Sequence, residues 1–208
     1  MNTLDNMARM FEKDTMAKFY DVIDDSRLFA PPFRFIHPKA RIAPGVVLGI
    51  GVVIEEDVVI DEGCFIGHYC IVRPRSKLGH RSEMRPWSWL AHEVVIGQET
   101  IIYQYANICH KAVLKDKIYF GCKSICTNAE DIRVHHPYGN IWENKPPVIE
   151  SGAIIATACQ LAPGVHVGKN AVLDMGSLLT KDIPDNQVWR GRPAKYVRDV
   201  NPMDRPVQ

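Results

Sequence analysis

The apolar positions of the chain repeat every six residues over most of its length. A large apolar residue opens each six-residue unit, and a small or β-branched residue nearly always follows four positions later. The large series first runs through Ile36, Ile42, Leu48, Ile54, Ile60, Ile66, Val72, Leu78, Met84, Leu90, Ile96, Ile102, Ile108, Leu114 and Phe120. After an interruption it continues through Ile149, Ile155, Leu161, Val167, Leu173 and Leu179. An α-helix repeats its apolar face near 3.6 residues and a simple strand at every second residue, so a period of six requires a short strand and a corner in each unit.

Three such units close one triangular coil. Each coil then pairs with the next at the usual strand separation of about 4.8 Å. The pattern therefore predicts an all-β protein, a parallel β-helix over 36–184, and it places residues that are three units apart side by side in neighbouring coils.

Three segments lie outside the repeat. Residues 1–35 contain an amphipathic pattern typical of a short helix, which we expect to cap the first coil. Residues 127–148 interrupt the period with prolines and a glycine, which indicates an inserted loop, and long loops are often functional. Residues 185–208 form a C-terminal tail.

Composition and charge narrow the class of protein. The 208 residues carry 25 Lys and Arg against 24 Asp and Glu, which argues against a nucleic-acid binder. No apolar run approaches the roughly 20 residues that span a bilayer, and the first residues lack the pattern of a secretory signal. We therefore expect a cytoplasmic protein with small partners and no membrane contact. The six cysteines lack a C-x-x-C spacing and are interpreted as reduced, small core residues.

The repeat resembles that of the hexapeptide-repeat acyltransferases, whose pattern is aliphatic, Gly, any, any, small, any. The pairs that match it in full are Leu48-Gly49, Ile66-Gly67, Leu78-Gly79, Ile96-Gly97 and Val167-Gly168. The resemblance is closest to bacterial sugar and amino-sugar acetyltransferases. It implies a left-handed coil, against the general preference for right-handed crossovers, and a homotrimer.

Four histidines occupy the third place of their units, which projects outward: His68, His80, His92 and His110. Only His92 and His110 among them lie three units apart, and a further three units lead to Asn128 at the start of the inserted loop. The spacing predicts a column of these three residues beside the loop. A second imidazole nearby disfavours protonation of either ring, so His110 suits the role of a base. We interpret His68 and His80 as solvated polar residues.

The motif around His110 resembles that of nucleotide-linked amino-sugar N-acetyltransferases. Ile108-Cys109-His110-Lys111-Ala112, Phe120-Gly121 and Cys126-Thr127-Asn128 carry this resemblance. It implies that His110 occupies an active-site position. Together with the predicted column, this leads us to expect His110 as the catalytic base and Asn128, through its side chain or backbone amide, as the donor to the oxyanion. His136-Pro137 resembles the His-Pro of maltose- and galactoside-type acetyltransferases, which makes His136 the second candidate. His92, Gln104 and Arg133 are the candidates for binding the sugar acceptor.

The C-terminal tail points to the acyl donor. Gly191-Arg192-Pro193-Ala194-Lys195 with Arg198 resembles the G-N-P-A-K-x-x-R ending of coenzyme A-dependent acetyltransferases. The resemblance implies acetyl-CoA as co-substrate and no metal. The residues expected to contact the donor are Ala158, Gly176, Thr180, Lys181, Arg192, Lys195 and Arg198.

Three functions remain open. The preferred one is acetyl transfer from acetyl-CoA to an amino group of a sugar, with a nucleotide-linked sugar favoured, and O-acetylation of a saccharide hydroxyl is the nearest alternative. A metalloenzyme like the γ-class carbonic anhydrases shares the fold, but the chain lacks the pair of histidines five apart that those enzymes carry. A non-catalytic scaffold is the third, against which the basic tail and the loop argue.

Overall fold

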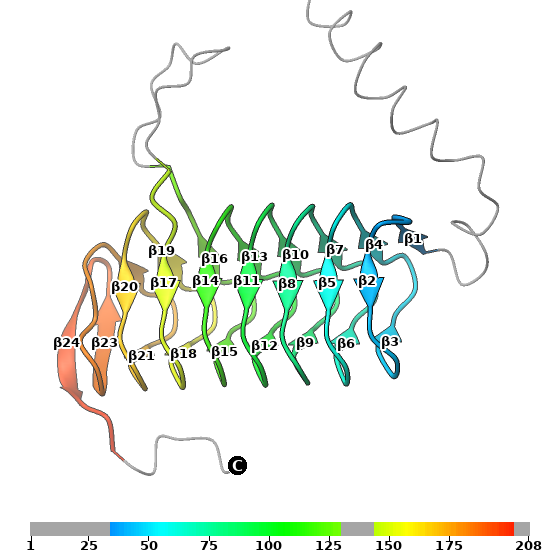
Figure 1. Cartoon of the computed structure of the whole chain (residues 1–208). Coiled ribbons are helices and arrows are strands. Elements are labelled where there is room, and N and C mark those ends of the chain that lie inside the picture. Colours follow the sequence, from blue (N-terminus) through cyan, green and yellow to red (C-terminus); the bar gives the residue numbers. More distant parts are fainter. Residues whose placement is uncertain (1–33, 130–143, 202–208) are drawn as a thin grey trace, which may run out of the picture.

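The computed structural model describes residues 34–129 and 144–201 (Figure 1). The expected helical cap at 1–35 lies outside the described residues except for its last two. The tip of the inserted loop, with Arg133 and His136, also lies outside them. The described part is a column of stacked coils, and none of its segments is a helix long and apolar enough to cross a membrane.

Three parallel sheets form the sides of the column. Sheet A consists of β1 (Phe35–Ile36), β4 (Val53–Ile54), β7 (Ile71–Val72), β10 (Trp89–Leu90), β13 (Asn107–Ile108), β16 (Ile125–Cys126), β19 (Gln160–Leu161) and β22 (Leu178–Leu179). Sheet B consists of β2 (Arg41–Ile42), β5 (Val59–Ile60), β8 (Lys77–Leu78), β11 (Val95–Ile96), β14 (Val113–Leu114), β17 (Val148–Ile149) and β20 (His166–Val167). Sheet C consists of β3 (Val47–Leu48), β6 (Phe65–Ile66), β9 (Glu83–Met84), β12 (Ile101–Ile102), β15 (Tyr119–Phe120), β18 (Ile154–Ile155), β21 (Val172–Leu173), β23 (Gln187–Gly191) and β24 (Ala194–Asp199).

The register of the sheets confirms the predicted coil of three units. Val95 pairs with Val113 in sheet B, and Trp89 pairs with Asn107 in sheet A. The described strands β1 to β21 make seven complete coils, and β22 begins another. The fold is the left-handed parallel β-helix expected from the repeat and its resemblance.

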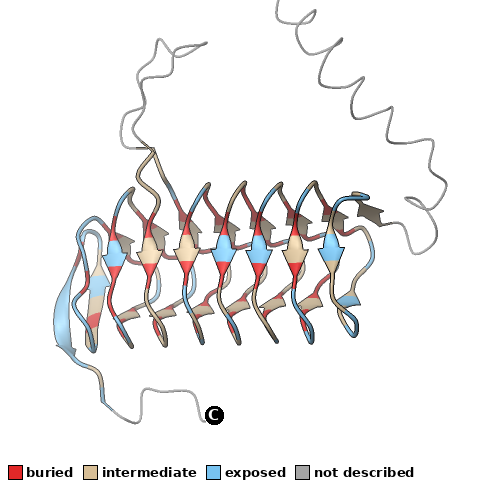
Figure 2. Ribbon diagram, in the orientation of Figure 1, coloured by how far each residue is buried: buried red, intermediate tan, exposed pale blue. Residues whose placement is uncertain are grey.

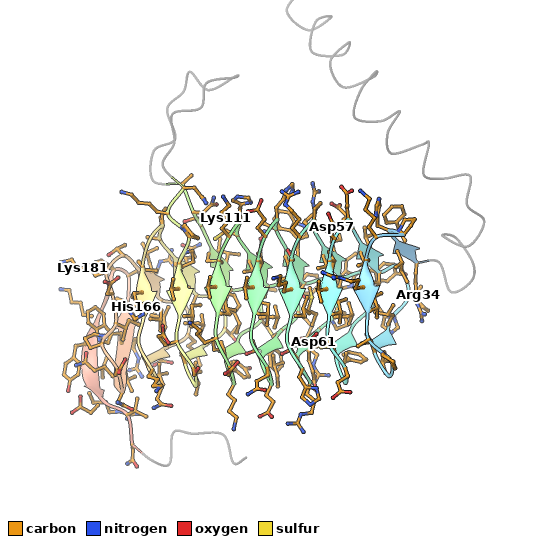
Figure 3. All side chains as sticks on the ribbon, viewed as in Figure 1. Arg34, Asp57, Asp61, Lys111, His166 and Lys181 are labelled. Carbon is orange, nitrogen blue, oxygen red and sulfur yellow. The ribbon has the colours of Figure 1, made fainter. Side chains whose placement is uncertain are left out.

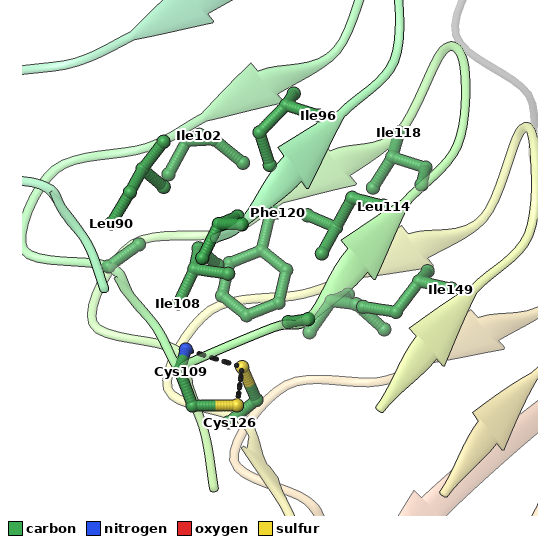
Figure 4. Close-up of a cluster of buried hydrophobic side chains, with 14 of the residues drawn as sticks. Leu90, Ile96, Ile102, Ile108, Cys109, Leu114, Ile118, Phe120, Cys126 and Ile149 are labelled. Carbon is green, nitrogen blue, oxygen red and sulfur yellow. Dashed lines mark hydrogen bonds between the residues drawn. The ribbon is translucent and has the colours of Figure 1, made fainter. Parts of the chain in front are cut away.

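The interior is filled by the first and fifth residues of each unit, as the period predicts. Large residues such as Ile102 and Ile108 are fully buried (Figure 4), and most strands pair one buried residue with a less buried one that faces outward (Figure 2). Polar residues at the fifth place bond to the backbone: Ser76 Oγ donates to the Ala91 carbonyl at 2.8 Å and accepts from Val94 N–H at 3.2 Å. These contacts explain how serines replace apolar residues in the core.

The cysteines at the fifth place behave as the sequence predicts. Cys64, Cys70 and Cys159 are reduced and at most 1% exposed, and the Cys64 thiol donates to the Gly79 carbonyl at 3.2 Å. Burial raises the pKa of all three thiols. They are core residues and are poorly suited to act as nucleophiles.

Short turns join the sheets at three corners. The AB corner comprises 37–40, 55–58, 73–76, 91–94, 109–112, 127–129, 144–147, 162–165 and 180–182. The BC corner comprises 43–46, 61–64, 79–82, 97–100, 115–118, 150–153 and 168–171. The CA corner comprises 49–52, 67–70, 85–88, 103–106, 121–124, 156–159 and 174–177. The fourth residue of most units has a positive φ, for example 59° at Glu93 and 60° at Lys111, and this turn directs its side chain outward.

The inserted loop leaves from the AB corner without disturbing the coils. Val113 pairs with Val148, beyond the whole insertion, as if the loop were absent from the count. The described base of the loop is held by an antiparallel bridge between Ala129 and Asn144 and by a bond from Lys145 N–H to the Asn128 carbonyl.

The tail folds back as a hairpin that extends sheet C. β23 pairs in parallel with β21, and β24 pairs with β23 in antiparallel fashion. The turn between them contains a cis Arg192-Pro193 bond. The hairpin covers the C-terminal end of the column (Figure 1).

Candidate active site

The predicted column of His92, His110 and Asn128 is present on the AB corner. The ring centroids of His92 and His110 lie 5.9 Å apart with an interplanar angle of 62°. The pairing of β10 with β13 places the two histidines one coil apart, and the pairing of Asn107 with Ile125 places Asn128 on the next coil. The repeat therefore determined this column correctly. Both rings are half-buried.

Arg73 of the same corner contacts this column and Glu55 contacts Arg73, and neither residue was among those predicted from the sequence. Arg73 Nη2 lies 3.0 Å from His92 Nε2, and Arg73 Nε lies 3.2 Å from Glu55 Oε2. Glu55 and Arg73 are three units apart and both occupy the second place of their units. This spacing is visible in the sequence and could have pointed to both residues.

The pKa of His92 lies below its ordinary value. Burial is the largest cause, the positive charge of Arg73 is the second, and His110 is the third. The sequence pointed to the second imidazole alone, whereas desolvation and the guanidinium contribute more in the structure. His92 is accordingly a neutral ring near pH 7.

Asn128 sits at the base of the inserted loop and uses part of its side chain to hold it. Its Nδ2 donates to Asn144 Oδ1 at 2.5 Å, and an amide has two such hydrogens. Asn128 thus fixes where the loop leaves the coil, next to His110.

One member of a buried thiol pair adjoins His110 in the sequence. The Sγ atoms of Cys109 and Cys126 are 3.2 Å apart, and Cys126 Sγ accepts from Cys109 N–H at 3.2 Å (Figure 4). The pKa of Cys109 is raised, first by its hydrogen bond with Cys126 and then by burial. Cys109, which precedes His110 in the sequence, is therefore a buried neutral thiol and does not offer a thiolate.

The two remaining third-place histidines lie on other corners. His80 is on the BC corner, where its Nδ1 lies 3.4 Å from Glu62 Oε1. His68 is on the CA corner, where its Nδ1 accepts from Ile50 N–H at 2.9 Å. Neither is near His110, which agrees with the interpretation of both as polar surface residues.

Several predicted ligand residues gather on the CA corner, away from His110 in the same chain. Gln104 accepts a hydrogen bond from the Cys122 thiol at 3.2 Å. Nearer the C-terminus, Ala158 and Gly176 stack with φ values of 59° and 68°, and a Cβ added at Gly176 would meet no atom within 4 Å. Arg192 crosses this surface, since its Nη1 donates to the Gly176 carbonyl at 3.1 Å and its Nη2 to Gln160 Oε1 at 2.7 Å.

The other predicted donor residues occupy two further places. Thr180 and Lys181 continue the AB corner at its C-terminal end, and Lys181 is exposed (Figure 3). Lys195 and Arg198 lie on β24, where both are exposed. The predicted donor set is therefore divided between two corners and the hairpin.

Potential metal ligands do not gather in the described residues. Among 34–129 and 144–201, no three His, Cys, Asp or Glu side chains are placed to share one ion.

The fold and the repeat define a hexapeptide-repeat left-handed β-helix. No family model matches the chain. A galactoside O-acetyltransferase of Lactococcus lactis is 44% identical over 61 residues, which are 29% of this chain and 30% of that protein. Across this and the next curated relatives the match spans about a third of each relative's length.

Solved structures share the fold. A hexapeptide-repeat acetyltransferase of Vibrio cholerae, crystallised with acetyl coenzyme A, superposes with a TM-score of 0.54 at 23% identity and covers 61% of this chain and 72% of that one. A UDP-N-acetylglucosamine acyltransferase superposes with a TM-score of 0.57 at 17% identity, covering 79% and 71%. These likenesses confirm the fold, and the sequence matches confirm the resemblance to hexapeptide-repeat acetyltransferases.

Proposed function

We propose that the protein transfers an acetyl group from acetyl-CoA to an amino group of a saccharide, with His110 as the general base. The observation that carries this proposal is the column of His92, His110 and Asn128 beside the base of the inserted loop. A single exposed histidine would support little. Here the neutral imidazole of His92, the imidazole of His110 and the amide of Asn128 lie on the same corner. The similarity to acetyltransferases supports the reaction class.

The proposed reaction is a direct transfer. The amine nitrogen of the acceptor attacks the thioester carbonyl carbon while His110 removes a proton from that nitrogen. A second N–H of Asn128, from its side chain or backbone, stabilises the oxyanion. The C–S bond then breaks, and the imidazolium of His110 returns its proton to the sulfur of coenzyme A. A positioned base of this kind contributes about 10² to 10⁴ in rate.

The CA corner is the proposed donor surface. Gly176 leaves open space and Ala158 adds only a methyl group, so an extended pantetheine arm can lie along the backbone there. Arg192 stands at the same surface, and Lys181, Lys195 and Arg198 supply positive charge for the phosphates. The small residues and the guanidinium come together only because the hairpin folds back on the last coils.

A homotrimer would unite the two corners. Sheet A lies between the AB and CA corners, and its described outward strand residues carry no charge; they include Ile71, Trp89 and Leu178. Among the outward strand residues of sheet C from β3 to β21, one is charged, Glu83. Sheet B instead presents Arg41, Lys77 and His166. We propose that sheet A of each copy faces the threefold axis, so that the AB corner of one copy meets the CA corner of the next.

A galactoside-type O-acetyltransferase is the second candidate. The 44% identity over 61 residues to such an enzyme favours it, and a base at His110 serves a hydroxyl as well as an amine. His136 and Arg133, the further candidates in the loop, are proposed to contact the acceptor.

An acceptor panel tests the function. The purified chain is incubated with acetyl-CoA and with matched amino and hydroxy sugars, free and nucleotide-linked, and release of the coenzyme A thiol is measured. Turnover with amino sugars alone supports N-acetylation, and turnover with hydroxy sugars selects the second candidate. No turnover and no binding of coenzyme A would reject an acetyltransferase.

Mixing two inactive variants tests the shared site. His110→Gln removes the base on the AB corner and Arg192→Glu reverses a donor contact on the CA corner. If neighbouring copies share each site, dissociating and reassembling an equal mixture restores about a quarter of the activity in a symmetric ring. No recovery in a reassembled mixture places both halves in one chain, and sedimentation as a monomer at micromolar concentration rejects the trimer.

A further inference from the structure

Glu55, Arg73 and His92 form a chain of polar contacts across three successive coils of the AB corner. The side chain of Glu55 is only 16% exposed, and its carboxylate lies 3.2 Å from Arg73 Nε. The far end of the same guanidinium lies 3.0 Å from His92 Nε2. The pairing of β4 with β7 and of β7 with β10 places the three residues in this order.

The chemistry of arginine determines the state of the ring that it contacts. A guanidinium has only N–H donors and remains charged in proteins. His92 Nε2 therefore accepts the hydrogen bond from Arg73 Nη2. The single proton of the neutral ring must then sit on Nδ1, because a proton on Nε2 would set two donors against each other.

The other charged groups around His92 do not offer an alternative partner for Nε2. Arg75 and Glu93 lie on the same corner, and Arg75 Nη2 pairs with Glu93 Oε1 at 2.8 Å. Lys111 also lies 3.6 Å from Glu93. Burial, Arg73, His110 and Arg75 all lower the pKa of His92, and Glu93 alone among the named groups raises it.

We infer that Arg73, held by Glu55, fixes His92 as a neutral imidazole with its proton on Nδ1, so that His92 serves the site as a hydrogen-bond donor. This makes His92 a positioning residue for the acceptor and leaves His110 as the base of the pair. The role toward the acceptor rests on the proposed function, whereas the tautomer does not. An N–H at Nδ1 selects a group with a lone pair, so the substrate presents a hydroxyl or carbonyl oxygen to His92 beside the atom that is acetylated.

Nitrogen NMR of the full chain, labelled with ¹⁵N in the imidazole rings, tests the tautomer without any substrate. The His92 signals are assigned as those lost in His92→Gln. At neutral pH we expect Nδ1 to show the shift of a protonated nitrogen and Nε2 that of an unprotonated one. A proton on Nε2, or a charged ring at that pH, would overturn the inference from the wild-type protein alone.

Two arginine variants provide a matched comparison. Arg73→Met removes the donor to Nε2, and we expect a mixture of tautomers and protonation of His92 at higher pH. Arg75→Met removes the same charge from the same corner without touching Nε2, so the Nδ1–H tautomer should persist. Glu55→Gln leaves Arg73 without its counter-charge and should give an intermediate result. Identical spectra for Arg73→Met and Arg75→Met would contradict the role of the hydrogen bond.

Kinetics with the acceptor identified by the sugar panel test the second half of the inference. Loss of one oriented hydrogen bond should raise the KM for the acceptor about threefold to tenfold in Arg73→Met, with the KM for acetyl-CoA unchanged. An effect on kcat alone contradicts a positioning role. If the wild-type protein transfers no acetyl group, the proposed function fails while the NMR result still stands.

Discussion

The AB and BC corners share one backbone geometry and one pattern of alternating charges at the fourth place, but the proposed base His110 lies on the AB corner. At the fourth place, Arg75, Glu93 and Lys111 alternate in sign along the AB corner. Arg81, Glu99 and Lys117 repeat the same alternation along the BC corner. Figure 3 shows Asp57 and Lys111 along the first of these edges. Because both corners carry these alternating charges, which we call charge ladders, the ladders are a feature of the coil and do not distinguish the proposed site.

The two corners differ at the second and third places. In the coils where the AB corner has Arg73 and Ala91 at the second place, the BC corner has Gly79 and Gly97. At the third place, the AB corner carries the imidazoles of His92 and His110 on adjacent coils, in an edge-on arrangement. On the BC corner, Gln98 N–H donates to Asp116 Oδ1 at 2.9 Å, so side chains are used to bind the neighbouring backbone. The two corners therefore differ at the second and third places of the unit, which are the places where the AB corner carries Arg73 and the proposed base His110.

Replacing the third-place histidine of the AB corner should change activity more than any other substitution considered below. We expect His110→Gln to lower kcat about 10² to 10⁴-fold, the usual contribution of a positioned base, with little change in the affinity for acetyl-CoA. His80→Gln alters the same kind of residue at the same place on the BC corner and should leave kcat near the wild-type value. Steady-state kinetics on both variants give the answer. Equal losses in both would show that these histidines act through the stability of the coil.

A smaller effect concerns stability at the second place. A Cβ on Gly97 would lie 2.6 Å from the carbonyl carbon of Lys115 on the next coil. We therefore expect Gly97→Ala to lower the free energy of unfolding by about 1 to 3 kcal/mol through overpacking. Ala91→Gly makes the reverse change on the AB corner and should cost less, about 0.4 to 1 kcal/mol. Urea unfolding measures both, and a neutral Gly97→Ala would show that the coils can separate there.

His92 on the AB corner should make the stability of the folded chain depend on pH. The pKa of His92 is lower in the folded chain than in the unfolded chain, so the unfolded state binds more protons below about pH 6.5. The contribution of His92 is complete above that pH and is lost as the pH falls toward its folded pKa. We expect the thermal stability of His92→Gln to fall less between pH 7 and pH 5 than that of the wild type. An unchanged slope would place the pH sensitivity elsewhere.

Replacing the glutamates of the alternating charges should change stability the least. Glu93 and Glu99 have partly exposed side chains, and their arginine partners lower the pKa of both. Exposed ion pairs contribute little and are screened by salt. Glu93→Gln and Glu99→Gln should therefore each destabilise less than Gly97→Ala, by similar amounts, and high salt should remove the difference from wild type. A large loss on one corner alone would mean that its ladder supports the site.

The period of six determined most of the fold because every unit must bury one large and one small residue at the same two places. Large residues such as Ile102 must face inward, and this alone sets strand, corner and register. The register in turn places His110 beside His92 and Asn128 in line with them. Cys64, Cys70 and Cys159 were likewise predicted as core residues from their place in the unit. The handedness came from the resemblance to the family and not from the spacing.

The tertiary structure decided what the period cannot express. The spacing of Glu55 and Arg73 put their backbones in line with the site, but only the course of the guanidinium showed that it bonds His92. Cys126 faces Cys109 because a first-place residue meets a second-place residue of another coil, a contact outside the three-unit step. The tail has no repeat, so its hairpin, and with it the approach of Arg192 to Gly176, followed from pairing with β21. A period determines where a residue stands, whereas the reach of a long side chain and the path of an irregular segment depend on what surrounds them in space.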